Sequence, residues 1–137
     1  MVSFTHGEGY GRPLAEFSVT GKPVIVSDWS GHVDFMKAHG IMLPGEIKDV
    51  HGSVVWDGVI NKDAKWFYVN YQYASGVIRD VHKNYKKYLE KSRKQTKYMK
   101  DNFTLDIMTN QFENILEKYL PSFDFEIPKL EELQTYE

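Results

Sequence analysis

The chain has 137 residues and a net charge of −2, and hydrophobic residues make up 42% of it. This length is typical of one domain with a buried core, and the hydrophobic content excludes an intrinsically disordered chain. Cysteine is absent, which excludes a disulfide framework and thiolate catalysis. No apolar run approaches the roughly 20 residues of a transmembrane helix, and no cleavable leader opens the chain, so we expect a cytoplasmic protein without a membrane span.

The first quarter of the chain predicts a strand, a helix and a second strand. Residues 2–5 are a strand candidate that enters a glycine-rich turn, and Pro13 suits the start of a helix that ends at Gly21. Residues 22–28, KPVIVSD, hold a continuous β-branched run, which is typical of a strand buried on both faces of a parallel sheet. The three elements together predict a βαβ crossover.

The middle of the chain is less regular. Residues 30–37 indicate a short helix, and residues 41–43 indicate a short strand. Residues 53–56 predict another strand, and the sequence WFYV at 66–69 predicts extended or packing structure. These short elements follow the βαβ unit and extend an α/β arrangement.

From Ala74 onward the apolar residues follow helical spacing and predict amphipathic helices with buried stripes. Thr104 suits the N-cap of the last helix, with Asp106 in its first turn. One stripe consists of Val77, Val81, Tyr85 and Leu89, and the other of Met108, Phe112, Ile115, Leu116 and Tyr119. We therefore expect an α/β fold with a short parallel sheet and C-terminal amphipathic helices.

Charge is unevenly distributed along these helices. Residues 83–100 carry eight basic side chains against one acid, whereas residues 101–137 carry nine acids against two lysines. A basic helix can bind nucleic acid or an anionic membrane, but these charges repeat opposite an apolar stripe. That spacing favours a solvated helix face beside the acidic helix, so nucleic acid is not an expected partner. Residues 121–137 predict an acidic, extended tail.

The glycine-rich turn carries the chemistry of the sequence. It reads THGEGYGRPLAEF, residues 5–17, and it joins the end of a strand to the start of a helix. Glycines let a backbone turn sharply and approach a ligand, and the N–H groups at a helix N-terminus attract anions. Ligands of open α/β sheets bind beyond the carboxyl ends of the strands, where this turn lies. The same pattern also fits a tight turn that only begins a helix.

Two carboxylates favour a ligand. Glu8 precedes the predicted helix and Glu16 lies within it, so both belong to the same anion-binding corner. Carboxylates beside a phosphate cradle can accept hydrogen bonds from sugar hydroxyls, one from a hexose and one from a ribose. Amides between them would hold a diphosphate, and the ligand with this layout is a nucleotide-sugar.

At these residues the sequence resembles the group 1 glycosyltransferases of GT-B fold. Their donor-binding domain carries a glutamate, seven residues and a second glutamate, which here is EGYGRPLAE, Glu8 to Glu16. The following GKPVIVSDWSGHVDF is similar to the family's G-x-P-V-I-x-(S/T), glycine loop and acid. Later stretches, including WFYV and NFTLDIM, are similar to a viral or environmental branch. The resemblance implies a partial, Rossmann-like nucleotide-sugar-binding domain over residues 1–120.

The resemblance also implies a role for individual residues. Glu8, the catalytic residue, contacts the transferred sugar, and Glu16 binds the ribose hydroxyls. Backbone amides near Pro13 and Leu14 meet the diphosphate. The donor-binding set implied in this way is His6, Gly7, Gly9, Tyr10, Gly11, Pro13, Leu14 and Glu16, and the further loop contacts are Ser27, Gly31 and Asp34.

No cofactor other than the donor nucleotide-sugar is expected, and no metal. The family stabilises the departing diphosphate with amides and basic groups rather than with a bound metal. The five histidines lack ligand spacing and fit loop or packing positions, with His6 the one that lies next to the motif. They are His6, His32, His39, His51 and His82.

The sequence also departs from the family. A GT-B enzyme has an acceptor domain and a donor domain, and its diphosphate clamp of arginine and lysine precedes the motif, whereas here only Met1–Thr5 precede it. We therefore expect the C-terminal part of a donor domain, as a piece of a longer enzyme or a naturally short gene product, inactive alone. Its strand at residues 2–5 would expose a sheet edge, which predicts a homo-oligomer. The alternative is a non-catalytic nucleotide-binding, sugar-binding or self-assembling module.

Overall fold

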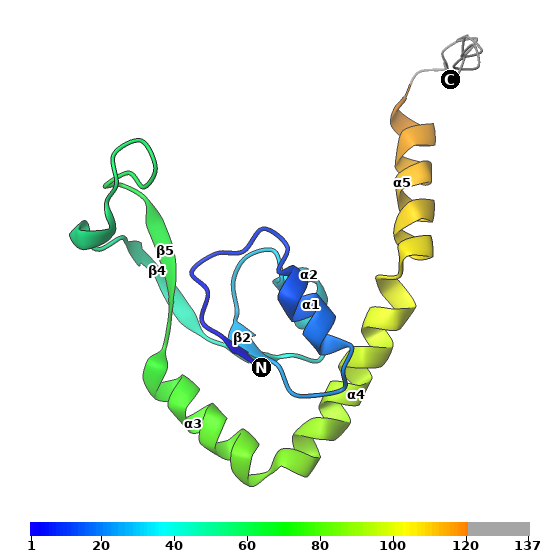
Figure 1. Ribbon diagram of the computed structural model, residues 1–137, viewed down its shortest axis with the longest axis horizontal. Coiled ribbons are helices and arrows are strands. Elements are labelled where there is room, and N and C mark those ends of the chain that lie inside the picture. The colour runs from blue at the N-terminus through cyan, green and yellow to red at the C-terminus, as the bar shows by residue number, and fades with distance from the viewer. Residues whose placement is uncertain (121–137) are drawn as a thin grey trace, which may run out of the picture. The chain divides into compact units, whose positions relative to one another are not determined.

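The computed structural model describes residues 1–120 and has an α/β fold (Figure 1). The expected α/β class and the short parallel sheet are confirmed. The described residues belong to two units, the first being Met1–Thr104 and the second beginning at Leu105. The sequence had predicted one domain through residue 120, with a tail at 121–137 that lies outside the described residues.

The parallel sheet of the first unit has three short strands in the order β1-β2-β3. They are β1 (Val2–Ser3), β2 (Ile25–Ser27) and β3 (Ile41–Leu43). Helix α1 (Arg12–Ser18) connects β1 to β2, and helix α2 (Val33–Met36) connects β2 to β3. The predicted βαβ crossover is therefore present.

Strand β2 is the centre of this sheet. Ile25 pairs with Val2 of β1 on one side and with Ile41 of β3 on the other, and all three β2 residues are buried. Ile25 points into one hydrophobic cluster while Val24 and Val26 point into the other, because side chains alternate between the faces of a strand. The prediction of a strand buried on both faces is confirmed.

The two clusters use different helices. On one face, the sheet packs with α1, α2 and helix α4 (Tyr85–Asn102). On the other face, it packs with strand β5 (Lys65–Val69) and helix α3 (Tyr71–Lys83). The first cluster contains Leu14, Ala15, Val24, Val26, Phe35, Met36 and Met99. The second contains Ile25, Leu43, Phe67, Val69, Ala74 and Val81. The sheet is thus covered on both faces, as parallel sheets are.

Helix α1 ends earlier than predicted. The sequence places its end at Gly21, but the helix stops at Ser18. The Ser18 hydroxyl donates to the Ala15 carbonyl and the Thr20 hydroxyl to the Phe17 carbonyl, both at 2.7 Å. These side chains satisfy carbonyls of the last turn, as serine and threonine readily do, so the helix closes before the glycine.

Strands β4 (Gly45–Asp49) and β5 (Lys65–Val69) form an antiparallel hairpin. The extended structure predicted at 66–69 is therefore confirmed. The strand predicted at 53–56 is wrong, because Gly52–Val54 forms a 3₁₀ helix, η1. The His51 ring accepts the Ser53 N–H at 3.2 Å, and this cap favours a turn over a strand.

The predicted stripe from Val77 to Leu89 spans two helices rather than one. Helix α3 (Tyr71–Lys83) and helix α4 (Tyr85–Asn102) meet at Asn84, where φ is −111° and ψ is 32°. The chain changes direction there (Figure 1). Val81 is buried, whereas Tyr85, the first residue of α4, is 43% exposed and lines an open groove together with Val81.

Helix α5 (Leu105–Tyr119) begins directly after Thr104, as predicted, but its predicted buried stripe is wrong. None of its side chains is buried, and Met108, Phe112 and Ile115 are 44%, 59% and 54% exposed. The apolar spacing identified the helix correctly. Spacing alone does not specify what covers a face.

The basic residues of the helices are exposed. All eight lysine and arginine side chains between residues 83 and 100 face solvent, which agrees with the predicted solvated face. Within residues 1–120, every helix is too short or too polar to cross a bilayer.

Candidate functional site

Two loops meet beyond the carboxyl ends of β1 and β2. The first joins β1 to α1, and the second joins β2 to α2. The Ser30 hydroxyl accepts the Glu8 N–H at 2.8 Å and donates to the Glu8 carbonyl at 2.7 Å. The Gly31 N–H donates to the same carbonyl at 2.9 Å. Three hydrogen bonds therefore fix the backbone of Glu8.

Glycines make this approach sterically feasible. A Cβ atom on Gly31 would lie 1.8 Å from the Gly9 carbonyl oxygen, a distance that no side chain can occupy. Gly11 has a φ of +86°, and Ser30 has a φ of +79°. A serine in this left-handed region is uncommon. Its two hydrogen bonds to Glu8 provide the compensation, since such conformations persist where the surroundings fix them.

The start of α1 presents several backbone N–H groups. The Gly11 carbonyl accepts the N–H groups of Leu14 and Ala15 at 2.9 and 3.0 Å, so the Leu14 amide is engaged and its side chain lies in the core. Among the described residues, the preceding four amides donate to no partner. They are those of Gly9, Tyr10, Gly11 and Arg12. The unengaged amides thus come before Pro13, not after it.

The two glutamates differ in exposure. Glu8 is partly buried in the first loop, whereas Glu16 lies on the exposed side of α1. The Glu16 carboxylate is 4.0 Å from the Arg12 guanidinium, and both side chains are largely exposed. An exposed ion pair at this distance contributes little to stability, so the fold does not require it.

The remaining predicted site residues differ in exposure: Ser27 is buried, and the others are exposed. Ser27 is fully buried, and its hydroxyl donates to the Thr5 carbonyl at 3.1 Å, so it supports the loops from within. Asp34 is exposed in the first turn of α2. Tyr10 is 44% exposed and contacts the Phe35 ring. Gly7 is exposed at the tip of the first loop.

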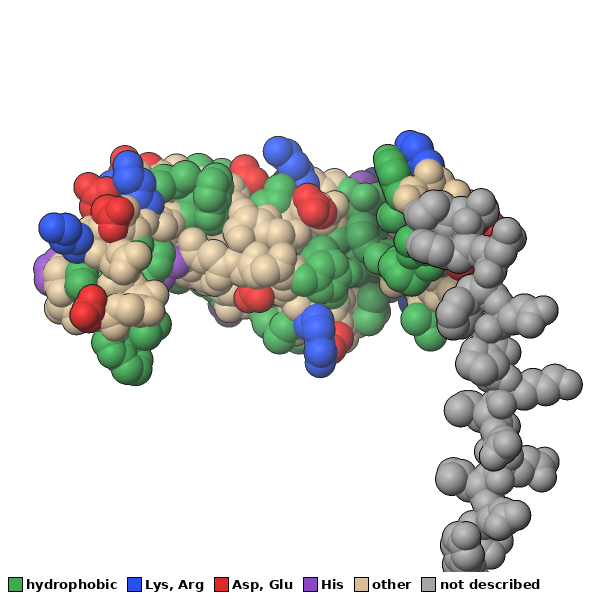
Figure 2. All heavy atoms as spheres, turned by 90° about the horizontal axis from the view of Figure 1, so that it is seen from above, with side chains coloured by type: hydrophobic (Ala, Val, Ile, Leu, Met, Phe, Trp, Pro, Cys, Tyr) green, Lys and Arg blue, Asp and Glu red, His purple; other side chains and the backbone are tan. Residues whose placement is uncertain are grey.

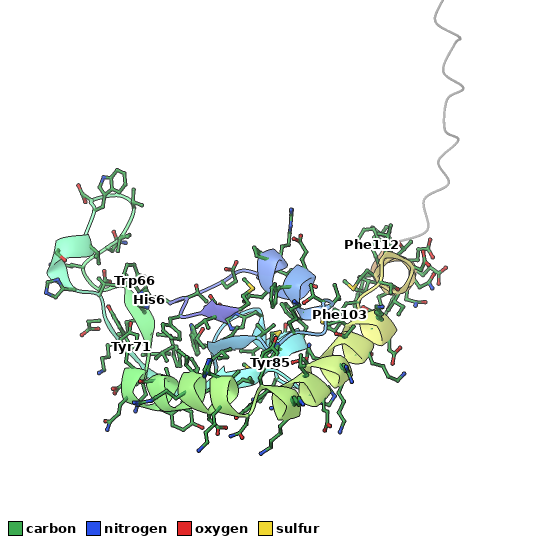
Figure 3. All side chains as sticks on the ribbon, turned by 60° about the horizontal axis from the view of Figure 1, so that its bottom comes forward. His6, Trp66, Tyr71, Tyr85, Phe103 and Phe112 are labelled. Atoms are coloured by element: carbon green, nitrogen blue, oxygen red, sulfur yellow. The ribbon has the colours of Figure 1, made fainter. Side chains whose placement is uncertain are left out.

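His6 joins this loop to the hairpin. Its ring stacks on Trp66 with centroids 4.7 Å apart (Figure 3), and its Nδ1 lies 2.7 Å from the Phe67 carbonyl oxygen. Because a carbonyl oxygen can only accept a hydrogen bond, Nδ1 is the donor and carries a proton. Strand β5 is therefore part of the wall of this corner, which the local sequence did not indicate.

His32 occupies a packing position, as the sequence predicts, whereas Ser30 was missed by sequence reasoning. His32 is fully buried, with Nε2 2.7 Å from the Ser27 carbonyl, and its Nδ1 has no partner among the described residues. Ser30 clamps Glu8. The signal for Ser30 was the WSGH sequence at residues 29–32, two positions after β2 ends at Ser27, since polar residues there lie at the ligand-binding edge of a parallel sheet.

The described residues contain no group of three or more histidine and acidic side chains that could hold a metal ion. Comparison with protein-family models, with curated proteins and with solved structures found no match for the chain. The inference of function therefore depends on the corner itself. It offers unengaged amides, two carboxylates of different exposure and an aromatic wall, a set that suits a ligand with both phosphate and hydroxyl groups.

Proposed function

We propose that the corner formed by the β1–α1 and β2–α2 loops binds a nucleotide-sugar, as the donor site of a glycosyltransferase. The observation that carries the proposal is the pair of hydrogen bonds between the Ser30 hydroxyl and the backbone of Glu8. It holds a carboxylate-bearing loop rigidly at the carboxyl end of a parallel sheet, with unengaged amides beside it. Preorganised backbone donors of this kind stabilise anionic groups at low reorganisation cost.

In the proposed complex the diphosphate accepts from the amides of the exposed residues Gly9, Tyr10 and Arg12, and Glu8 accepts from a hydroxyl of the sugar. Glu16 accepts from the ribose hydroxyls. In the reaction, the bond between the anomeric carbon and the diphosphate oxygen breaks, the oxygen of an acceptor hydroxyl forms the new bond to that carbon, and its proton passes to the departing diphosphate. The diphosphate leaves with the bonding electrons, and the amides stabilise its charge.

The chain alone is proposed to bind the donor without transferring the sugar. Arg12 is the single lysine or arginine between Thr5 and Phe17, and it already lies 4.0 Å from Glu16. A leaving diphosphate normally needs more positive charge than one exposed guanidinium supplies. Binding and turnover are therefore separate tests of the site.

The test is calorimetric titration of the chain with UDP, GDP, ADP and their glucose conjugates. We expect at least one of these nucleotides to bind. Because a hydrogen bond to a carboxylate contributes about 1.5–3 kcal/mol, Glu16→Ala should weaken the affinity for that nucleotide by about tenfold or more. Glu90→Ala removes an exposed carboxylate from α4 and is the matched control, with unchanged affinity. Failure of every nucleotide to bind, or equal losses in both variants, would exclude the donor site.

A second candidate function, self-assembly, is favoured by a specific observation. Strand β1 is an edge of the sheet, and an apolar groove of about 290 Å³ runs beside it. Val2, Ile78 and Tyr85 line this groove and are 48%, 39% and 43% exposed. An open strand edge beside apolar side chains is a surface on which another strand can pair. We propose a second copy of this chain as its occupant.

A further inference from the structure

A separate surface of the first unit carries an unassigned hollow. It lies where the β4–β5 hairpin meets the start of α3, and its volume is about 560 Å³. Its lining combines two tyrosine rings, an ion pair and backbone groups. This volume lies within the range typical of small-molecule sites in proteins, about 300–1,000 Å³.

The two tyrosines are held in place by other rings. Tyr68 contacts the His6 ring with centroids 4.8 Å apart, and Tyr71 contacts Phe4 edge-on at 5.8 Å. Figure 3 shows Tyr71 at the start of α3. Tyr71 nevertheless remains 57% exposed. A fixed ring with a free surface gives contact area to a ligand without the entropy cost of ordering a side chain.

The polar groups of the hollow carry no net charge. Lys48 Nζ lies 2.6 Å from a carboxylate oxygen of Glu46, and the register of the hairpin places Glu46 opposite Tyr68. The pair presents donors and acceptors side by side beside the rings. A ligand here would meet hydrogen-bonding groups without a net charge to attract an ion.

The surroundings also lack a field of one sign. Acidic and basic side chains are interspersed around the hairpin (Figure 2). Such a mixed surface does not concentrate anions or cations. The lysine of the hollow is already neutralised by its partner at 2.6 Å, so a phosphate is disfavoured as its ligand.

We infer that this hollow binds a neutral saccharide. The face of an aromatic ring carries a partial negative charge. A pyranose ring presents C–H groups with a partial positive charge, which pack on that face. The hydroxyls around such a ring donate and accept, which matches an ammonium and a carboxylate lying 2.6 Å apart. The hollow shares no lining residue with the corner at Glu8, although His6 of that corner contacts Tyr68, and the inference does not depend on the proposed donor function.

The full chain should be titrated with maltotriose, cellotriose and mannotriose, with binding followed by two-dimensional NMR. We expect at least one trisaccharide to bind and to shift the amide signals of residues 68–71. Tyr71→Ala should weaken this binding by about tenfold, from the loss of ring contact, whereas Tyr71→Phe keeps the ring and should retain most of it. Inorganic phosphate should not displace the sugar.

The matched control is Tyr73→Ala, because Tyr73 is 52% exposed on the same helix and does not line the hollow. Its affinity for the sugar should equal that of the unmodified chain. Glu46→Gln tests the ion pair without touching either ring, and it should weaken binding. The inference is overturned if no trisaccharide binds, if Tyr73→Ala loses as much affinity as Tyr71→Ala, or if only Glu16→Ala abolishes binding. That last result would assign the sugar to the proposed donor corner.

Discussion

A Cβ atom on Gly31 would lie 1.8 Å from the carbonyl oxygen of Gly9, so the two loops of the corner touch through a residue without a side chain. Gly31→Ala must push these loops apart. We expect it to lower the free energy of unfolding by about 1–3 kcal/mol, as overpacking typically does, and to weaken nucleotide binding. Urea denaturation followed by tryptophan fluorescence measures the first effect.

The control for this substitution is Gly7→Ala. A Cβ atom on Gly7 has no neighbour within 4 Å, and its φ is not in the left-handed region. Its effect should stay within about 0.5 kcal/mol, as for most surface positions. Equal losses for the two variants would mean that the close approach of the loops is not what holds the corner.

Gln95 links α4 to α2 through its buried amide. Its Nε2 donates to the Phe35 carbonyl at 2.7 Å, and its Oε1 accepts the His39 N–H at 3.1 Å. Gln95→Leu keeps the volume but leaves both backbone groups without this partner, so we expect a loss of about 2 kcal/mol in urea denaturation. Gln72→Leu, at an exposed position of α3, should change stability little. An unchanged free energy of unfolding for Gln95→Leu would show that water replaces the amide as the partner of these backbone groups.

The sequence predicted the centre of the fold because the signals there are local. The β-branched run before Ser27 is buried on both faces of the sheet, and the strand at Ile41–Leu43 occurs as predicted. A glycine-rich turn followed by Pro13 predicted the start of α1, which begins at Arg12. Hydrophobic runs and turn residues act within a few positions of the chain.

The predictions were wrong where side-chain caps or tertiary contacts determine the local conformation. The His51 ring caps η1 in place of the predicted strand, and Asn84 interrupts a helical stripe that continues in sequence. At the corner, Ser30 bonds a residue 22 positions earlier, and His6 bonds Phe67 from 61 positions away. Such pairs carry no local signal, so only the three-dimensional structure reveals them.

The hydroxyl of Tyr88 donates to the Asp80 carboxylate, and Asn84 Nδ2 donates to its other oxygen at 2.7 Å. These two hydrogen bonds hold the pKa of Asp80 below its ordinary value, and the bond from Tyr88 has the larger effect. The folded pKa of Asp80 is thus lower than the unfolded one. The stabilisation is present above the unfolded pKa and is lost as the pH falls through the folded pKa.

We therefore expect Tyr88→Phe to raise the pKa of Asp80 toward its ordinary value, which an NMR titration of the carboxyl carbons measures. Tyr85→Phe alters a nearby tyrosine that makes no bond to Asp80 and should leave that pKa unchanged. The same bond raises the pKa of Tyr88, so its contribution should be lost as the pH rises through the folded pKa. An Asp80 pKa that ignores Tyr88→Phe would contradict this assignment.

Val2 lies on the open edge of β1 and is 48% exposed beside the apolar groove. If a second copy covers this edge, the chain should sediment as a dimer or larger assembly at high concentration. Val2→Lys places a charge on the edge, which is how natural sheets prevent edge pairing, and should return it to a monomer. Val59→Lys charges an exposed position of the hairpin loop and should leave the assembly intact. A monomeric unmodified chain at high concentration would exclude self-assembly through β1.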